Sequence, residues 1–166
     1  IVNMEVYKVE QLKADIKKEI LEELKKDNEN IKILKSEGIM NFLKCKKTKF
    51  EEVVNNKFYK LPVVKIGRTY YSTEKQLVKY LELSDNQYEN YRNNILRNSN
   101  KSDNYGVVLT KGQLKEMFNM CEKKFSKFIQ SNQLPCRVIG DSCNTTSRAL
   151  QNWFFANEGK EIDIKY

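Results

Sequence analysis

Lysine side chains gather at two places in the chain, where their spacing would let them hold phosphate groups. Residues 46–49 read Lys-Lys-Thr-Lys, and residues 122–127 read Glu-Lys-Lys-Phe-Ser-Lys. An ammonium group is a compact point charge on a flexible stem, so it suits phosphate contact, whereas Arg and Asn suit bidentate recognition. These two segments are therefore the candidate binding residues, and the elements that expose them have to be identified.

The composition excludes several kinds of catalysis. The chain has 166 residues and no His, so Ser-His-Asp and Cys-His mechanisms and His-ligated metals are absent. No Gly-rich phosphate loop is present, and carboxylate pairs such as Glu22-Glu23 and Glu51-Glu52 are expected on helix surfaces. We therefore predict a protein that is not an enzyme, with no cofactor and no small-molecule substrate.

The cysteines do not have the spacing of a metal site. Cys45, Cys121, Cys136 and Cys143 lack the CxxC pattern, so we predict no bound metal. Cys45 falls on an apolar position and is expected to be a buried thiol. Cys136 and Cys143 could face each other across a predicted hairpin, although a disulfide there would be unusual in the cytosol.

The positive charge is concentrated in two blocks. Of the net +8, residues 34–83 carry +6 and residues 107–155 carry +4, whereas residues 1–33, 84–106 and 156–166 are neutral or slightly acidic. Such blocks favour a polyanionic partner. The frequent Lys, Asn and Ile also indicate an AT-rich genome, which by itself would enrich lysine, so an ordinary solvated surface is the alternative interpretation.

The two basic blocks repeat one apolar pattern. Leu61-Pro62 and Ile66-Gly67 in the first correspond to Leu134-Pro135 and Ile139-Gly140 in the second. The offset is 75 residues before these motifs and 73 from them onward, and both prolines of the chain fall at the same place in the unit. This agreement predicts a tandem repeat.

Each copy predicts two short helices, a hairpin and a third helix. In the second copy, Thr110 is expected to cap a helix that carries Leu114, Met117 and Phe118 at helical spacing. A second helix follows through Phe125, and the hairpin after it turns at Gly140-Asp141 before a helix capped by Thr146 or Ser147. The first copy predicts the same order, with Ser36 as the first cap, a turn at Gly67-Arg68, and Ser72 or Thr73 as the last cap.

This order resembles the excisionase and MerR-like winged helix-turn-helix family of bacteria, phages and plasmids. The resemblance rests on residues 61–68 and 77–81 in the first copy, and on residues 134–140 and 150–154 in the second. It implies a mainly α protein with small β-hairpin wings (α+β), in which two winged helix-turn-helix units follow a long N-terminal helix. It also implies binding to double-stranded DNA, with the second helix of each unit in the major groove and the wing at the minor groove or backbone.

The resemblance also assigns the DNA-contacting residues. Carried over residue by residue, they are Lys46, Lys47, Thr48 and Lys49 on the first recognition helix, Arg68, Thr69 and Tyr70 on the first wing, and Lys123, Lys124 and Lys127 on the second recognition helix. Asp141 stands where the second wing should carry a basic residue. We therefore expect the first wing to be the better DNA contact and the second wing to pack against protein.

The remaining segments are expected to connect or extend these units. We divide the chain into an N-terminal helix (1–33), unit 1 (34–83), a linker with a short helix (84–106), and unit 2 with a tail (107–166) that extends as a strand or frays. An apolar stripe along residues 5–27 either packs on unit 1 or forms a homodimer. No apolar run approaches the roughly 18 residues that span a bilayer, so we predict no membrane association and a cytoplasmic protein.

Two functions of different class remain open. The first is a DNA-binding protein of a phage or plasmid that acts as an architectural or regulatory factor, such as an excisionase-like protein, a relaxosome component, a replication or partition accessory, or a repressor. The second is a protein-binding adaptor that keeps the fold without DNA recognition, which Asp141 and the apolar pair Val63-Val64 support. The salt dependence of binding to random duplex would distinguish them.

Overall fold

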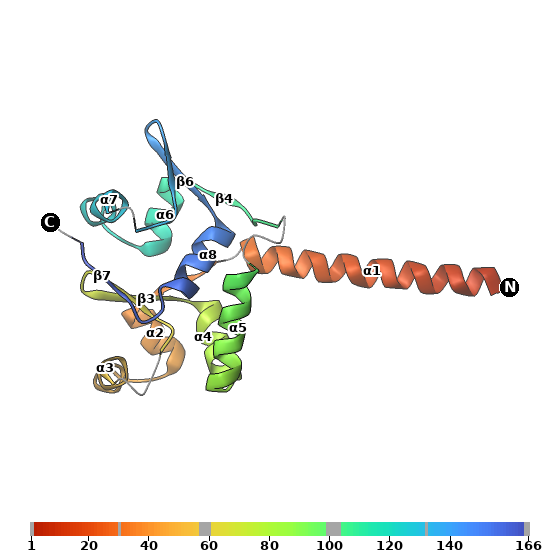
Figure 1. Ribbon diagram of the computed structural model, residues 1–166, viewed down its shortest axis with the longest axis horizontal. Coiled ribbons are helices and arrows are strands. Elements are labelled where there is room, and N and C mark those ends of the chain that lie inside the picture. The colour runs from red at the N-terminus through yellow and green to blue at the C-terminus, as the bar shows by residue number, and fades with distance from the viewer. Residues whose placement is uncertain (1, 30, 57–60, 99–103, 132, 165–166) are drawn as a thin grey trace.

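The computed structural model shows an α+β protein with small sheets surrounded by helices (Figure 1). It describes residues 2–29, 31–56, 61–98, 104–131 and 133–164. The order strand, helix, helix, hairpin and helix occurs in two successive runs. We call the first run, β1 to α4, the first repeat, and the second run, β4 to α8, the second repeat.

The helices and hairpins lie where the sequence predicts them, whereas the strands before each first helix were not predicted. The first repeat comprises β1 (Ile33–Lys35), α2 (Ser36–Leu43), α3 (Lys47–Asn55), β2 (Val64–Ile66), β3 (Thr69–Thr73) and α4 (Glu74–Glu82). The second comprises β4 (Val108–Leu109), α6 (Lys111–Phe118), α7 (Glu122–Gln130), β5 (Arg137–Ile139), β6 (Ser142–Thr146) and α8 (Ser147–Ala156). Outside them lie α1 (Val2–Glu29), α5 (Asp85–Arg97) and β7 (Glu161–Ile162).

The turns of both repeats use the same backbone conformations. Lys44 and Asn119, 75 residues apart, end α2 and α6 in the left-handed region at φ 54° and 49°. Such a residue reverses the chain at a helix C-terminus, and Asn accepts the conformation more readily than Lys. Gly67 and Gly140 open the hairpin turns at φ 63° and 62°, as a two-residue hairpin loop requires. The periodic spacing therefore corresponds to matching local geometry.

The helix caps were predicted correctly except for the first. Thr73 and Thr110 each accept the backbone N–H of the residue three positions later at 3.3 Å, and Thr146 caps α8 in the same way. The cap predicted at Ser36 is wrong, because Lys35 is the N-cap and Ser36 is already helical. Pairing of β1 with β3 holds residues 33–35 extended and brings the Ser36 hydroxyl to β3, where it accepts the Tyr70 N–H at 3.0 Å.

The C-terminal tail is a strand in the sheet of the first repeat. Within the described residues the strands of that sheet follow the order β1-β3-β2-β7, and those of the second sheet follow β4-β6-β5. β7 runs parallel to β2 with Lys65 opposite Glu161. The Lys65 N–H donates to the Lys160 carbonyl at 3.0 Å, and the Gly67 N–H donates to the Ile162 carbonyl at 2.9 Å. Of the two predictions for the tail, extension as a strand is therefore correct.

The first sheet has a hydrophobic core on each side, because successive side chains of a strand point to opposite faces. On one side, Leu61 and Val63 pack with Ile39 and Phe50 of the helices α2 and α3. On the other side, β2 and β3 contribute to a core that is filled mainly by the second repeat and the tail: Val64, Ile66, Tyr71, Leu114, Phe118, Phe125, Phe128, Leu150, Phe154, Ile162 and Ile164. The two repeats therefore share one core.

The linker helix belongs to the same packed body. Helix α5 contacts α4 and α8, so it connects the repeats by packing as well as by chain. Residues 99–103 of the predicted linker (84–106) lie outside the described residues.

The long helix α1 projects from this body (Figure 1). Its side chains at residues 3–19 are all exposed, so the prediction that it packs on the first repeat is wrong for this part. The reason is that α2 and α3 already cover one face of the first sheet, and the second repeat and the tail cover the other. Among the described residues, no helix combines the length and the apolar character that crossing a membrane requires.

Candidate nucleic-acid interface

The start of α3 is the most clearly exposed basic segment of the first repeat. Lys46 is the N-cap, and Lys47, Thr48 and Lys49 form the first turn with their side chains in solvent. Phe50 anchors the helix beneath them, because it is 3% exposed and its ring packs edge-on against Tyr70 at 5.7 Å between centroids. All four predicted residues of this helix are thus held outward by one buried neighbour.

Sequence reasoning missed one cation beside this turn. Lys44, in the left-handed turn between α2 and α3, is also exposed. The repeat could have pointed to Lys44, because it corresponds to Asn119 at the offset of 75 residues between the two copies. Lys49 is 3.7 Å from Glu52, but both side chains are 66% exposed. An exposed pair of this kind is worth little and leaves the lysine available for another anion.

The predicted residues of the first hairpin, β2–β3, divide between surface and core. Arg68 is exposed at the turn, whereas Thr69 and Tyr70 are half-buried. The Tyr70 ring packs against Phe50 and lies 5.6 Å from the Lys65 ammonium group. Of these three predicted residues, Arg68 is therefore the one whose side chain is exposed to a ligand, and Tyr70 helps to hold α3 in place.

Lys124 lies between the repeats. Its ammonium group is 3.5 Å from the Tyr71 hydroxyl and 5.6 Å from the Tyr71 ring centroid. Burial lowers the pKa of the Lys124 ammonium group, and repulsion from the positive charge of Lys35 lowers it further. Lys123 is exposed and Lys127 is half-buried on the same helix. The three predicted lysines of α7 are thus not equivalent, and Lys124 is directed at the first repeat.

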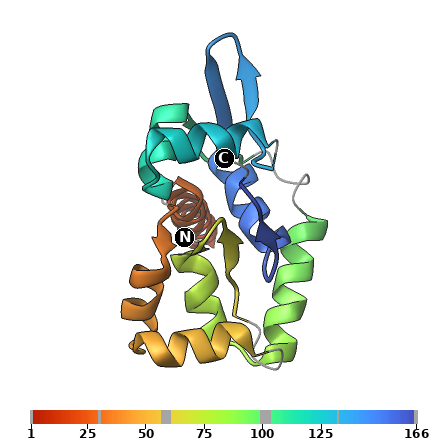
Figure 2. The same cartoon turned by 90° about the vertical axis from the view of Figure 1, so that its left-hand side faces the viewer.

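The two hairpins have the opposite environments from those predicted. The first is enclosed, since β7 pairs with its outer strand and Lys124 lies against it. The second, β5–β6, projects from the body, and Arg137, Val138 and Ile139 are all exposed (Figures 1 and 2). Asp141 at the second turn suggested that this hairpin would pack against protein, but the charge of the turn does not decide the packing. The tail and α7 cover the first sheet instead.

A disulfide in the second hairpin joins the residue just before β5 to the second residue of β6. Cys136 and Cys143 are bonded, with their Cα atoms 5.9 Å apart. The sequence placed these residues opposite each other and left the bond open. Of the other two cysteines, Cys45 is half-buried and Cys121 is exposed, both as free thiols.

The helices α3 and α7 lie on one face of the molecule. Figure 2 shows both running across this face, α3 at its lower end and α7 at its upper end. In Figure 1 both are seen nearly end-on at the same side of the molecule, which agrees with this arrangement. We call this surface, with α3, α7 and the first hairpin, the basic face.

Acidic residues of the tail also reach the basic face. A groove of about 620 Å³ is lined by Lys65, Arg68 and Lys124 from the two repeats and by Glu161 and Asp163 from the tail. Lys65 and Glu161 form an ion pair at 3.6 Å. The sequence could not show this, because the pairing of β7 with β2 joins segments almost 100 residues apart.

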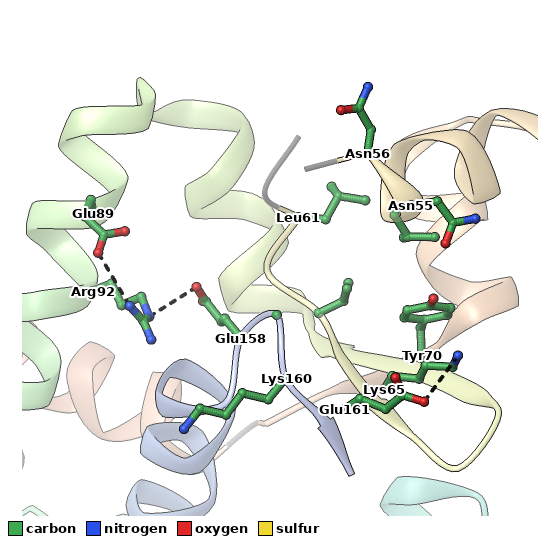
Figure 3. Close-up of a pocket in the computed structure, with 13 residues that line it drawn as sticks. Asn55, Asn56, Leu61, Lys65, Tyr70, Glu89, Arg92, Glu158, Lys160 and Glu161 are labelled. Carbon is green, nitrogen blue, oxygen red and sulfur yellow. Dashed lines mark ion pairs between the residues drawn. The ribbon is translucent and has the colours of Figure 1, made fainter. Parts of the chain in front are cut away.

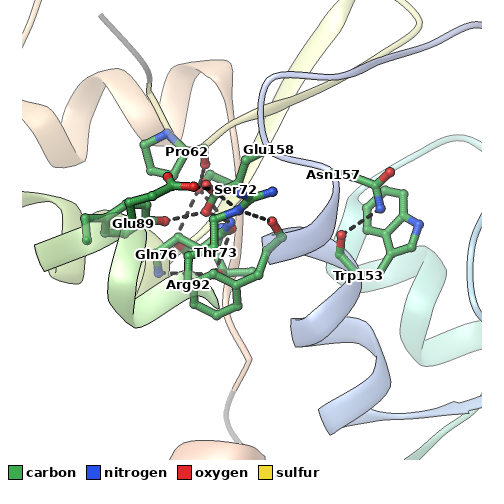
Figure 4. A network of polar contacts seen from close by, with 11 residues as sticks. Pro62, Ser72, Thr73, Gln76, Glu89, Arg92, Trp153, Asn157 and Glu158 are labelled. Carbon is green, nitrogen blue, oxygen red and sulfur yellow. Dashed lines mark hydrogen bonds and ion pairs between the residues drawn. The ribbon is translucent and has the colours of Figure 1, made fainter. Parts of the chain in front are cut away.

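A partly buried polar network connects the two repeats (Figure 4). The Glu158 carboxylate accepts hydrogen bonds from the Tyr88 hydroxyl and, at 2.8 Å, from the Gln76 amide, and it lies 3.3 Å from Arg92. Arg92 also donates to the Phe155 carbonyl at 2.7 Å. The network thus ties α4 and α5 to the end of α8. Sequence reasoning did not identify it, since its members are far apart in the chain.

Burial controls the ionisation of this network. It raises the pKa of Glu158, against the opposing effect of the hydrogen bonds from Tyr88 and Gln76 and of the Arg92 charge. Burial also raises the pKa of Tyr88, and the nearby Glu158 charge adds to this. Tyr88 therefore stays protonated and acts as a donor to Glu158.

A cavity of about 610 Å³ lies beside this network, between the end of α3 and the C-terminal turn (Figure 3). Its lining combines the cations Arg92 and Lys160 with the carboxylate of Glu158 and with apolar Leu61, so the cavity has mixed polarity. Residues 57–60, which connect the lining residues Asn56 and Leu61 in the sequence, lie outside the described residues. In the part of the chain that the structure describes, no cluster of three or more His, Cys, Asp or Glu side chains could hold a metal ion.

Comparison of the chain with protein-family models, with curated proteins and with solved structures finds no match.

Proposed function

We propose that the chain is a double-stranded DNA-binding protein composed of two winged helix-turn-helix units. In this proposal α3 and α7 are the helices that approach DNA, and the hairpins β2–β3 and β5–β6 are the wings. The observation that supports it best is that both of these helices lie on one face, with exposed lysines at the start of α3 (Figure 2). One duplex could then contact both units.

The start of α3 would be the principal phosphate contact. Lys44, Lys46, Lys47 and Lys49 surround the N-terminus of the helix, and the helix dipole adds positive potential there. Lysine contacts to phosphate give affinity without much sequence information. We therefore expect a strongly salt-dependent affinity, with selectivity coming from DNA shape or from the spacing of the two units.

The second repeat would contribute fewer contacts on α7 than the sequence suggests. Lys123 and Lys127 remain candidates, whereas we assign Lys124 to the contact between the repeats because it faces Tyr71. The projecting second hairpin adds Arg137, which is exposed. This arrangement suits an architectural or regulatory factor of a phage or plasmid, of the excisionase-like, relaxosome, replication, partition or repressor kind.

The direct test is a triple substitution on α3. Lys46→Ala, Lys47→Ala and Lys49→Ala together should weaken binding to a random duplex in fluorescence anisotropy. The slope of log K against log salt should decrease by up to about 2.7, since each phosphate contact contributes about 0.9.

The matched control removes the same charge elsewhere. Lys8→Ala, Lys18→Ala and Arg97→Ala change exposed cations on α1 and α5, away from the basic face. This variant should keep the wild-type slope. If both triple substitutions lower the slope equally, only the net charge of the protein matters. If the α3 substitution leaves the slope unchanged, α3 is not a DNA-contacting helix.

The adaptor alternative loses one supporting observation, and the structure adds a different one. Val63 and Val64 are 7% and 1% exposed, so they belong to the core and offer no docking surface. Val138 and Ile139 on the second hairpin are 64% and 62% exposed, which favours contact with an apolar partner. If the protein fails to bind duplex DNA at low salt, the adaptor function is the better proposal.

A further inference from the structure

The projecting helix α1 carries an apolar stripe with nothing of the described chain against it. Val6, Val9, Leu12 and Ile16 are 52%, 52%, 60% and 48% exposed. Their steps of 3, 3 and 4 residues place them on one side of a helix with about 3.6 residues per turn. A helix standing alone in water has only marginal stability, so a partner along this stripe would stabilise it.

The charges around the stripe favour a second copy of the chain over a polyanion or a membrane. Residues 3–19 carry four acidic and four basic side chains, all exposed. A helix that binds an anionic membrane surface is instead dominated by Lys and Arg on its polar side. A neutral helix with both signs of charge is compatible with its own copy.

The distribution of these charges also indicates how two copies would be oriented. By helical geometry, one edge of the stripe carries Glu5, Asp15 and Glu19 with Lys8 among them, so it is mainly acidic. The other edge carries Lys13 and Lys17 with Glu10 beside them, so it is mainly basic. In a parallel pair related by a twofold axis, the acidic edge of each helix faces the basic edge of its copy, as in the charged flanks of coiled coils. An antiparallel pair would bring like edges together.

We propose that α1 forms a parallel two-helix pair with α1 of a second copy, through the stripe of Val6, Val9, Leu12 and Ile16. The body of each copy then lies at the C-terminal end of the pair. This dimer does not depend on the proposed DNA binding.

Sedimentation or light scattering of the intact chain tests the pairing. The wild-type protein should have twice the chain mass of 19.7 kDa, and Leu12→Lys with Ile16→Lys should reduce it to one chain. The matched control is Met4→Lys with Tyr7→Lys, since these residues are 68% and 69% exposed on the opposite side of the helix. The control should remain dimeric. A monomeric wild type, or a dimer that survives the stripe substitutions, would overturn the proposal.

Cross-linking tests the orientation. Val6→Cys and Ile16→Cys are made separately in a chain with Cys45→Ser and Cys121→Ser, so that the native free thiols are absent. A parallel pair places each residue opposite its own copy, so both variants should form disulfide-linked dimers on mild oxidation. In an antiparallel pair, a residue can lie opposite its own copy at only one position along the helix, so at most one of the two variants would cross-link. A dimer in which one variant or neither cross-links would contradict the parallel arrangement.

Discussion

The Lys124 ammonium group lies 3.5 Å from the Tyr71 hydroxyl, so a helix of the second repeat rests on the sheet of the first. Tyr71 is itself fully buried, and its ring packs edge-on against Phe118 of the second repeat at 5.8 Å. The contact shows why a lysine that the sequence assigns to a binding surface has a different environment from its neighbour Lys123. It also makes the two residues a sensitive pair for mutagenesis.

We expect Lys124→Ala to lower the free energy of unfolding by about 1 kcal/mol, because it removes the methylene packing and the contact with Tyr71. Lys123→Ala should change it by less than about 0.5 kcal/mol, since its side chain is exposed. Urea denaturation measures both. For DNA affinity, corrected for the fraction of protein that is folded, Lys123→Ala should have the larger effect and Lys124→Ala the smaller. Equal stability of the two variants would argue against Lys124 as a contact between the repeats.

Removing the Glu158 side chain should destabilise the protein more strongly. Glu158→Ala leaves Arg92, Tyr88 and Gln76 without their shared partner and should cost about 2 kcal/mol. Glu158→Gln keeps the shape and an acceptor oxygen, so its cost should be clearly smaller. Thermal or urea unfolding compares the variants, and an equal cost for Ala and Gln would mean that the charge, and not the hydrogen bonding, holds the network.

The pH dependence of stability should also report Glu158. Because burial raises its pKa in the folded state above the ordinary 4.5, the folded protein binds this proton more readily than the unfolded chain. As the pH falls from neutral towards 4.5, the wild type should gain stability relative to Glu158→Gln, which cannot titrate. Chemical denaturation at several pH values gives this difference, and a loss of relative stability on acidification would contradict the raised pKa.

The acidic tail residues should weaken DNA binding if the proposed function is correct. Glu161→Gln with Asp163→Asn removes two negative charges from the basic face. Duplex affinity should rise roughly fivefold, at about 0.5 kcal/mol per exposed charge. Glu82→Gln with Asp85→Asn is the control, because it removes the same charge at the exposed end of α4 and start of α5. Its duplex affinity should stay close to that of the wild type, and an equal increase in both would make the effect one of net charge.

Much of the secondary structure could be predicted because it depends on near neighbours in the chain. A threonine three residues before a glutamine caps a helix at Thr73 and at Thr110, and a glycine opens the hairpin turn at Gly67. The failure at Ser36 has the opposite origin. There, pairing of β1 with a strand more than 30 residues away sets the start of the helix.

The candidate site could be predicted only in part. The outward lysines of α3 follow from the helical position of Phe50, which is a local pattern. The assignments of Tyr70 and Lys124 to a binding surface did not anticipate their packing, because the sequence does not show what covers each element. The exposure of the two hairpins was also not anticipated, because the prediction used the charge at each turn and not the elements that cover each hairpin.

The sequence by itself determined the helices, the hairpins, their repetition and the location of the positive charge, since each depends on spacings of a few residues. Only the tertiary structure decided that Ile162 pairs its strand with Ile66, that Lys124 reaches Tyr71, and that residues 3–19 of α1 are left exposed. These outcomes depend on which apolar surfaces bury one another across long stretches of chain. The position of a charge in the sequence therefore does not reveal whether it faces solvent or a neighbouring repeat.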